Sequence, residues 1–147
     1  MKVLAIASKG GHWVEMLRLT RAFNDMEIVY VSTNKNLAKT VIDNKFYVIP
    51  DSSRWNKSQM IRSFTNVFKI IRIEKPDFII STGAAPGLMG ILAGKLLGRT
   101  TIWIDSIANV EKLSMSGRLA IPIADKIYTQ WPSLVDSKVE YAGNVLL

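Results

Sequence analysis

Residues 2–12 read KVLAIASKGGH, and the glycine pair in this stretch decides how the rest of the chain is interpreted. The apolar run Lys2–Ala7 is typical of a parallel strand that is buried on both faces. Apolar residues then recur at helical spacing from Trp13 to Phe23. A strand, a glycine turn and a helix start would gather unpaired N–H groups at the positive end of a helix dipole, which is a candidate anion site. The alternative is that the glycines only permit a tight turn.

The alternation of strand and helix continues along the chain. Apolar spacing predicts further strands at 27–32, 46–49, 77–81, 100–104, 126–129 and 139–142, and helices at 34–44, 57–74, 86–97 and 117–124. This order is typical of an α/β fold, a Rossmann-like parallel sheet with helices on both faces, and we expect one domain over residues 1–147. Ligands of such sheets bind at the carboxyl ends of the strands, so the loops at 8–12, 81–87 and 105–109 are the candidate site.

The loop after the fourth predicted strand has a composition that suits an anion. Ser81, Thr82 and the amides around Gly83 and Ala84 could bind oxygen atoms, and Pro86 suits the first turn of the following helix. The alternative is that small residues here only allow the helix to pack closely on the strand.

Several classes of protein are disfavoured by what the sequence lacks. With no cysteine and one histidine, no disulfide and no Cys/His metal site are expected. No Walker A or G-x-G-x-x-G motif is present, and the second strand ends in Ser32-Thr33-Asn34 without a carboxylate for a ribose, which argues against NAD. We therefore expect no cofactor. No stretch approaches the roughly 18 apolar residues of a membrane span, and a cytoplasmic location is expected.

The net charge of +7 comes entirely from the first half of the chain. Residues 1–75 hold 13 Lys and Arg against 6 Asp and Glu, whereas residues 76–147 hold 6 of each. An anionic partner is expected to meet that first half, and a nucleic acid, an anionic membrane or a phosphorylated substrate would each fit. A generally basic soluble surface is the alternative.

The predicted helix at 57–74 bears on the choice among these partners. Its predicted apolar face consists of Met60, Ile61, Phe64, Val67, Phe68 and Ile71, with Ile70 and Ile73 outside it. Arg62, Lys69 and Arg72 gather beside that face, as in helices that lie on anionic lipid. The alternative is a core helix with a solvated basic side. No nucleic-acid motif accompanies the charge, so nucleic acid is not an expected partner.

Two titratable residues are candidates for catalysis. His12 would lie at the mouth of the site, where imidazole can act as a general base near neutral pH. Asp105 would follow a buried strand, where a carboxylate is costly unless it is paired or catalytic. A structural histidine at the helix start and a loop-bracing aspartate are the respective alternatives.

Four runs of the sequence together resemble a known family: STGAAPG (81–87), WIDSIAN (103–109), KLSMSG (112–117) and ADKIYTQWP (124–132). They are similar to the membrane-associated, acceptor-side subunit of split UDP-sugar glycosyltransferases. In eukaryotes this subunit recruits the catalytic half of the enzyme that adds the second N-acetylglucosamine to a dolichol pyrophosphate, and bacterial relatives serve capsule and exopolysaccharide assembly.

The resemblance implies the N-terminal, acceptor-side half of a GT-B glycosyltransferase. In one-chain relatives, such as the transferase acting on the peptidoglycan lipid precursor, a Gly-Gly-His loop and a second glycine loop face the lipid diphosphate. The matching positions here are Gly10, Gly11 and His12, then Thr82, Gly83 and Ala84. Ser106 and Asn109 fall in a further acceptor-side loop.

The same resemblance implies a second chain. YAGNV (141–145) is similar to the segment where one-chain enzymes cross to their donor-binding half, so we expect a partner subunit to hold the UDP-sugar and this chain to be inactive without it. The N-terminal membrane span of eukaryotic members is not seen here, and peripheral attachment to the cytoplasmic face through the basic helix is expected instead.

The sequence thus favours an acceptor-binding, membrane-recruiting subunit that holds a lipid-pyrophosphate-linked sugar, with His12 as the first candidate base and Asp105 as the second. The alternative is a non-catalytic scaffold that only brings the donor-binding subunit to the membrane.

Overall fold

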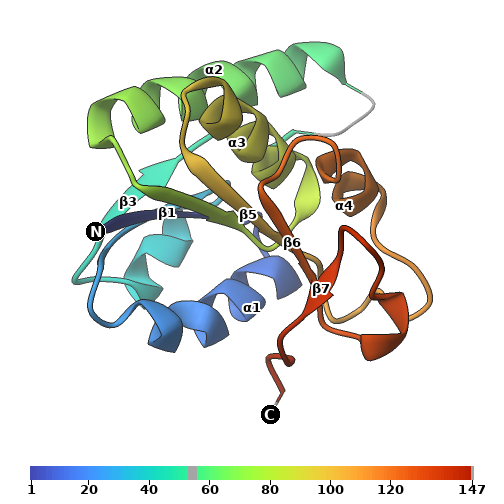
Figure 1. Ribbon diagram of the computed structural model, residues 1–147. Helices are drawn as coiled ribbons and strands as arrows, with labels where there is room; N and C mark the ends of the chain where they lie inside the picture. The colour runs from blue at the N-terminus through green and yellow to red at the C-terminus, as the bar shows by residue number, and fades with distance from the viewer. Residues whose placement is uncertain (53–55, 147) are drawn as a thin grey trace.

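The computed structural model describes residues 1–52 and 56–146, and within them seven parallel strands form one sheet in the order β3-β2-β1-β4-β5-β6-β7 (Figure 1). The strands are β1 (Lys2–Ile6), β2 (Glu27–Ser32), β3 (Lys45–Val48), β4 (Phe78–Ser81), β5 (Thr100–Ile104), β6 (Lys126–Thr129) and β7 (Glu140–Tyr141). This is the predicted Rossmann-like parallel sheet.

Helices cover both faces of the sheet. They are α1 (Gly11–Leu19), α2 (Lys57–Glu74), α3 (Ala84–Leu96) and α4 (Met115–Ala120), with 3₁₀ turns η1 (Thr20–Phe23), η2 (Lys35–Thr40) and η3 (Pro132–Leu134). In Figure 1, α2 and α3 lie above the sheet and α1 lies below it. Successive residues of β1 enter opposite cores: Leu4 and Ile6 pack on the α2 and α3 side, and Val3 and Ala5 on the α1 side.

Three predicted helices differ from the observed structure, one in kind and two at their ends. The segment predicted as a helix at 34–44 contains only the 3₁₀ turn η2, in which no residue is fully buried and Leu37 alone packs partly against the core, so little tertiary packing supports a longer helix. Helix α3 begins at Ala84, two residues earlier than predicted, so Pro86 lies in its first turn. Helix α4 begins at Met115, because the Ser114 side chain accepts the Gly117 N–H and caps it.

The predicted apolar face of α2 was partly wrong. Ile70 is buried at 6% exposure, whereas Ile61 is 66% exposed. The buried stripe also holds two polar residues, Ser63 and Glu74. A face located from apolar residues alone leaves these two out. When they are included, the centre of the buried face shifts around the helix toward Ile70.

Candidate functional site

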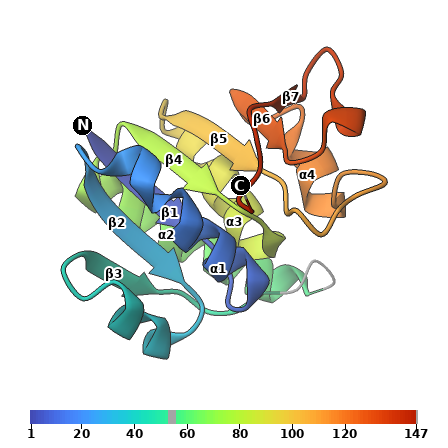
Figure 2. The same ribbon diagram turned by 90° about the horizontal axis from the view of Figure 1, so that it is seen from below.

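The loops that follow β1, β4 and β5 lie at one edge of the sheet. These strands are neighbours in the order β1-β4-β5 and run parallel, so their carboxyl ends coincide. Figure 2 shows the arrowheads of β4 and β5 pointing to the edge at which α1 begins. The three loops predicted from the sequence are therefore brought together, as expected at the carboxyl edge of a parallel sheet.

His12 is joined to the loop after β4 by two hydrogen bonds. Its Nδ1 lies 2.9 Å from the carbonyl oxygen of Thr82, and the Thr82 hydroxyl donates to the His12 carbonyl at 2.7 Å. A carbonyl oxygen only accepts, so Nδ1 carries a proton, and a neutral ring then has its lone pair on Nε2. Among the described residues Nε2 makes no hydrogen bond. The His12 imidazole is therefore fixed in orientation through Nδ1, and its Nε2 is available to accept a hydrogen bond.

Gly83 is the residue that lets the histidine ring lie against the loop. A Cβ at this position would meet Cε1 and Nδ1 of His12 at 2.5 Å, and its φ of 141° is one that side chains rarely adopt. Ala84, which opens α3, also has a positive φ of 67°. The ring and the backbone of this loop therefore fit each other closely.

The glycine pair after β1 is open by contrast. A Cβ at Gly10 or Gly11 would meet no atom of the described residues within 4 Å, and both residues are exposed. Gly10 takes a φ of 83° and no side chain caps α1. The N–H groups of Trp13 and Val14 donate to the Gly10 carbonyl at 3.1 and 3.2 Å, whereas those of Gly11 and His12 make no hydrogen bond within the described residues, so a ligand can approach these two.

The hydroxyls of Ser81 and Thr82 are both engaged in hydrogen bonds within the protein. Ser81 is fully buried, its Oγ accepts the Gly83 N–H at 3.2 Å, and Gly87 packs on it so closely that a Cβ there would lie 1.9 Å from Oγ. The Thr82 hydroxyl proton goes to His12. The Ser81 hydroxyl is too deeply buried to reach a ligand and the Thr82 proton is already donated, so the backbone amides at the start of α3 are what this loop can offer.

Asp105 is saturated with hydrogen bonds. It is 1% exposed, and its carboxylate accepts the Trp103 indole N–H at 3.0 Å, the Asn109 amide at 3.1 Å, and the N–H and hydroxyl of Ser114 at 2.8 and 2.6 Å. Gly117 packs against the same carboxylate. This geometry is that of the loop-bracing alternative, since no carboxylate oxygen is left for a substrate.

Glu15 joins helix α1 to the loop after β5, and it was not among the residues predicted from the sequence. Its Oε1 accepts the Ser106 hydroxyl at 2.8 Å and the Ile107 N–H at 3.1 Å, although it is only 6% exposed. Glu15 follows His12 by three residues and is therefore one helical turn away. A charged residue between the buried Trp13 and Met16 was the signal that could have found it.

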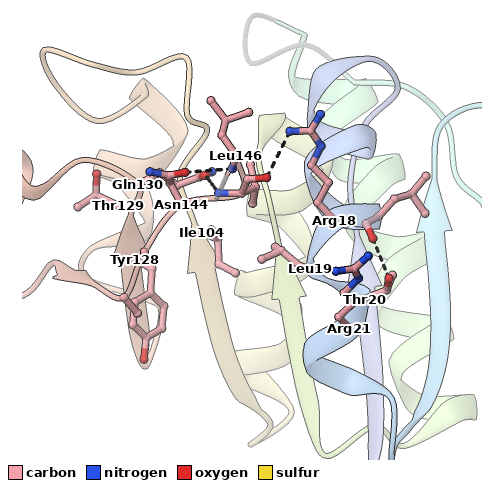
Figure 3. Close-up of a pocket in the computed structure, with 14 residues that line it drawn as sticks. Arg18, Leu19, Thr20, Arg21, Ile104, Tyr128, Thr129, Gln130, Asn144 and Leu146 are labelled. Atoms are coloured by element: carbon pink, nitrogen blue, oxygen red, sulfur yellow. Dashed lines mark hydrogen bonds between the residues drawn. The ribbon is translucent and has the colours of Figure 1, made fainter.

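A cleft of about 790 Å³ adjoins the site between the end of α1 and the carboxyl ends of β5 and β6 (Figure 3). The end of α1, η1, Ile104, residues 128–130 and the segment 142–146 line it. Gln130 joins the two regions, because its Nε2 donates to the Asp105 carbonyl at 3.0 Å and its Oε1 accepts the Val145 N–H at 3.0 Å. Arg18 donates to the Val145 carbonyl at 3.3 Å.

The family model for Oligosaccharide biosynthesis protein Alg14 like matches residues 3–145. The chain belongs to this family. The human UDP-N-acetylglucosamine transferase subunit ALG14 is 28% identical to it, over 99% of this chain and 83% of that protein. The subunit of the same name from Yarrowia lipolytica is also 28% identical, over 97% of this chain and 80% of that protein.

Solved structures show the same fold for this Alg14-like chain. MurG from Acinetobacter baumannii matches with a TM-score of 0.79 at 15% identity, over 97% of this chain and 46% of that chain. A UDP-GlcNAc 2-epimerase from Neisseria meningitidis matches with a TM-score of 0.73 at 12% identity, over 98% of this chain and 46% of that chain. The Alg14-like chain spans about half the length of these proteins. The predicted family and the predicted GT-B half fold are confirmed.

The basic residues predicted to face a membrane are all exposed on α2: Arg62, Lys69 and Arg72. Near its start, α2 also forms an apolar groove of about 390 Å³ with α3, lined by Lys57, Met60, Ile61, Phe64, Met89 and Leu92. Within residues 1–52 and 56–146, the Alg14-like chain has no helix that is both long and apolar enough to span a bilayer.

Proposed function

We propose that this chain is the acceptor-side subunit of a two-chain glycosyltransferase, which transfers a sugar from a UDP-sugar to a lipid-linked pyrophosphoryl sugar in oligosaccharide or polysaccharide assembly, capsule and exopolysaccharide included. The observation that carries the proposal is the hydrogen-bonded contact between His12 and Thr82. It holds an imidazole, whose Nε2 makes no hydrogen bond in the described part of the chain, between two loops whose backbone N–H groups suit a diphosphate. Membership of a family whose relatives are named transferase subunits supports it.

His12 would act as the base of an inverting transfer. Its Nε2 takes the proton of the acceptor hydroxyl as that oxygen bonds to the anomeric carbon of the donor sugar, and the bond from that carbon to UDP breaks, so UDP leaves. The amides after β1 and β4 would hold the acceptor diphosphate, and much of the rate would come from orienting two bound substrates. Ser106 and Asn109 belong to the loop that borders the acceptor.

The UDP-sugar would be held by a donor-binding partner subunit. The relatives are named as subunits of a UDP-N-acetylglucosamine transferase, so UDP-N-acetylglucosamine is the first donor to assay. We expect transfer by the complex of both chains and none by either chain alone.

Substitution of the open glycine separates this proposal from its alternative, the non-catalytic scaffold. A Cβ at Gly11 meets no described atom within 4 Å, so Gly11→Ala is expected to fold and to bind the partner while obstructing the approach of a diphosphate to the amides. We expect transfer to fall at least 10-fold with partner binding unchanged. Wild-type transfer by this variant would favour the scaffold.

Peripheral attachment to the cytoplasmic face of the membrane is proposed through α2. Its exposed Arg62, Lys69 and Arg72 would meet anionic headgroups, and its apolar groove lies on the same helix. Reversing the three charges to Glu should weaken binding to vesicles of anionic lipid by at least about 100-fold, because each lost basic residue costs about 1 kcal/mol and each new carboxylate is repelled. The control reverses Lys35, Lys39 and Lys138, three exposed residues elsewhere. Equal loss in both triple variants would contradict a role for this face.

A further inference from the structure

Glu15 is a buried carboxylate that the proposed chemistry does not use. It lies in the middle of α1 at 6% exposure. Both of its hydrogen bonds fall on Oε1, from Ser106 and Ile107, while Oε2 is buried and has no partner in the described part of the chain. An ionisable group is costly to bury in this way, so its presence needs a reason beyond packing.

The loop after β5 is held from three directions, and only one of them comes from the side of His12. Asp105 fixes the loop from within, and the Trp131 indole donates to the Ile107 carbonyl at 2.7 Å. Glu15 binds the other backbone polar group of Ile107, because it accepts the Ile107 N–H. In the described residues these Glu15 contacts are the hydrogen bonds between α1 and this loop.

Helix α1 touches a different loop at each of three successive turns. His12 bonds to the loop after β4, Glu15 to the loop after β5, and Arg18 to the segment at Val145. Residues three apart on a helix lie on neighbouring sides of it, so these contacts wind partly around α1 from its start toward its end. Glu15 is therefore the hydrogen-bonded link between the Ser106–Asn109 loop and the helix that carries His12.

We propose that Glu15 is a positioning residue of the acceptor site. Its Oε1 holds Ser106 and Ile107 at a fixed place relative to His12, so that the loop bordering the acceptor and the candidate base face one bound substrate. This inference rests on the proposed function. The role requires an oxygen at the position of Oε1 that can accept hydrogen bonds, since Ser106 and Ile107 both donate to that atom.

Three variants of the assembled complex test this role. Glu15→Ala removes the oxygen that accepts the two hydrogen bonds, and Glu15→Gln keeps an oxygen that can accept both. Glu27→Ala is the control and removes an exposed glutamate at the opposite edge of the sheet. With UDP-N-acetylglucosamine and a lipid-pyrophosphate N-acetylglucosamine acceptor, E15A should raise the KM for the acceptor at least 10-fold and leave the KM for the donor unchanged. E15Q should stay within about 5-fold of wild type and E27A should match it. Equal rises in E15A and E15Q, or no rise in E15A, would overturn the proposal.

Amide hydrogen exchange on the full chain tests the contact without any transfer assay. The protection factor of the Ile107 amide should fall at least 10-fold in E15A and stay at the wild-type value in E15Q and E27A. Unchanged protection in E15A would overturn the contact, and lost protection with a wild-type acceptor KM would overturn the positioning role. A wild-type complex that transfers no sugar would instead refute the proposed function, and the exchange result would still decide whether Glu15 holds the loop.

Discussion

The loops after β1 and β5 flank the same site, yet they differ in how far their polar groups are already used. In the first, Gly10 and Gly11 face open space and the second nitrogen of His12 makes no hydrogen bond within the described residues. In the other, the Asp105 carboxylate accepts four hydrogen bonds. A group already bonded within the protein cannot bind a ligand without losing that bond. The comparison separates residues that can bind or react from residues that hold the site in place.

The largest expected effect is loss of the base on the open side of this comparison. His12→Ala should lower kcat of the assembled complex by about 10²–10⁴-fold, as expected for removal of a general base. It should reduce stability by only about 1 kcal/mol, because one hydrogen bond to Thr82 is lost. Steady-state transfer assays with equal amounts of complex measure the effect. Val14→Ala, at a half-exposed position on the same helix, is the control and should transfer at the wild-type rate.

Gly83→Ala should disturb the same imidazole by contact. The new Cβ would lie 2.5 Å from the ring, which must move, and misplacement of a catalytic group by about 1 Å can cost about 10²-fold in rate. Gly98→Ala is a matched control, since Gly98 also has a positive φ but has nothing within 4 Å of its Cβ. Both variants should unfold at lower temperature, and only G83A should lose transfer. Equal transfer rates in the two variants would refute the link between Gly83 and His12.

Asp105→Asn should affect stability more than transfer, the reverse of His12→Ala. An amide cannot accept all four hydrogen bonds, so at least one buried donor loses its partner and stability should fall by about 3 kcal/mol. The kcat of the folded complex, measured at saturating acceptor, should stay within about 5-fold of wild type, because Asp105 holds the loop and does not react. Urea unfolding and transfer assays measure the two quantities. Asp43→Asn, at an exposed carboxylate, should change neither. A stable D105N chain with lost transfer would make Asp105 a catalytic group after all.

The smallest predicted effect lies far from the site and depends on pH. Burial would raise the pKa of Glu74, but hydrogen bonds from Tyr47, Lys2 and Lys45 outweigh it and lower the pKa of this carboxyl. The stabilisation is therefore present at neutral pH and is lost as the pH falls from about 4.3, the unfolded value, through the lower folded pKa.

Glu74→Gln should accordingly lower stability at pH 7 by about 1–2 kcal/mol and flatten its decline in acid. Unfolding by urea across this pH range measures both effects, with transfer at pH 7 unchanged. Glu111→Gln, at an exposed carboxylate, should leave the profile as it is. A parallel decline in E74Q and wild type would show that other groups govern acid unfolding.

The sheet, the bounds of α2 and the three loops of the site were predictable because they depend on local patterns. Continuous apolar runs mark buried parallel strands, and parallel strands place the loops after residues 6, 81 and 104 at one edge. The resemblance in the sequence motifs correctly indicated the family.

The use of each side chain was not predictable, since it depends on contacts between distant residues. Ser81 and Thr82 resembled ligand donors in the sequence, but their hydroxyls bond to Gly83 and His12. The bonds from Glu15 to the loop after β5 span more than 90 residues of sequence. Whether a polar group is free or already bonded is a property of the folded chain.

The most direct test of this account is the rate of sugar transfer from UDP-N-acetylglucosamine to a lipid-pyrophosphate N-acetylglucosamine acceptor, measured for the assembled complex, for each chain alone and for the complex carrying His12→Ala. The account predicts turnover by the wild-type complex, none by either chain alone, and a rate at least about 10²-fold lower for the variant. Turnover by this chain alone, or a wild-type rate in the His12→Ala complex, would contradict it.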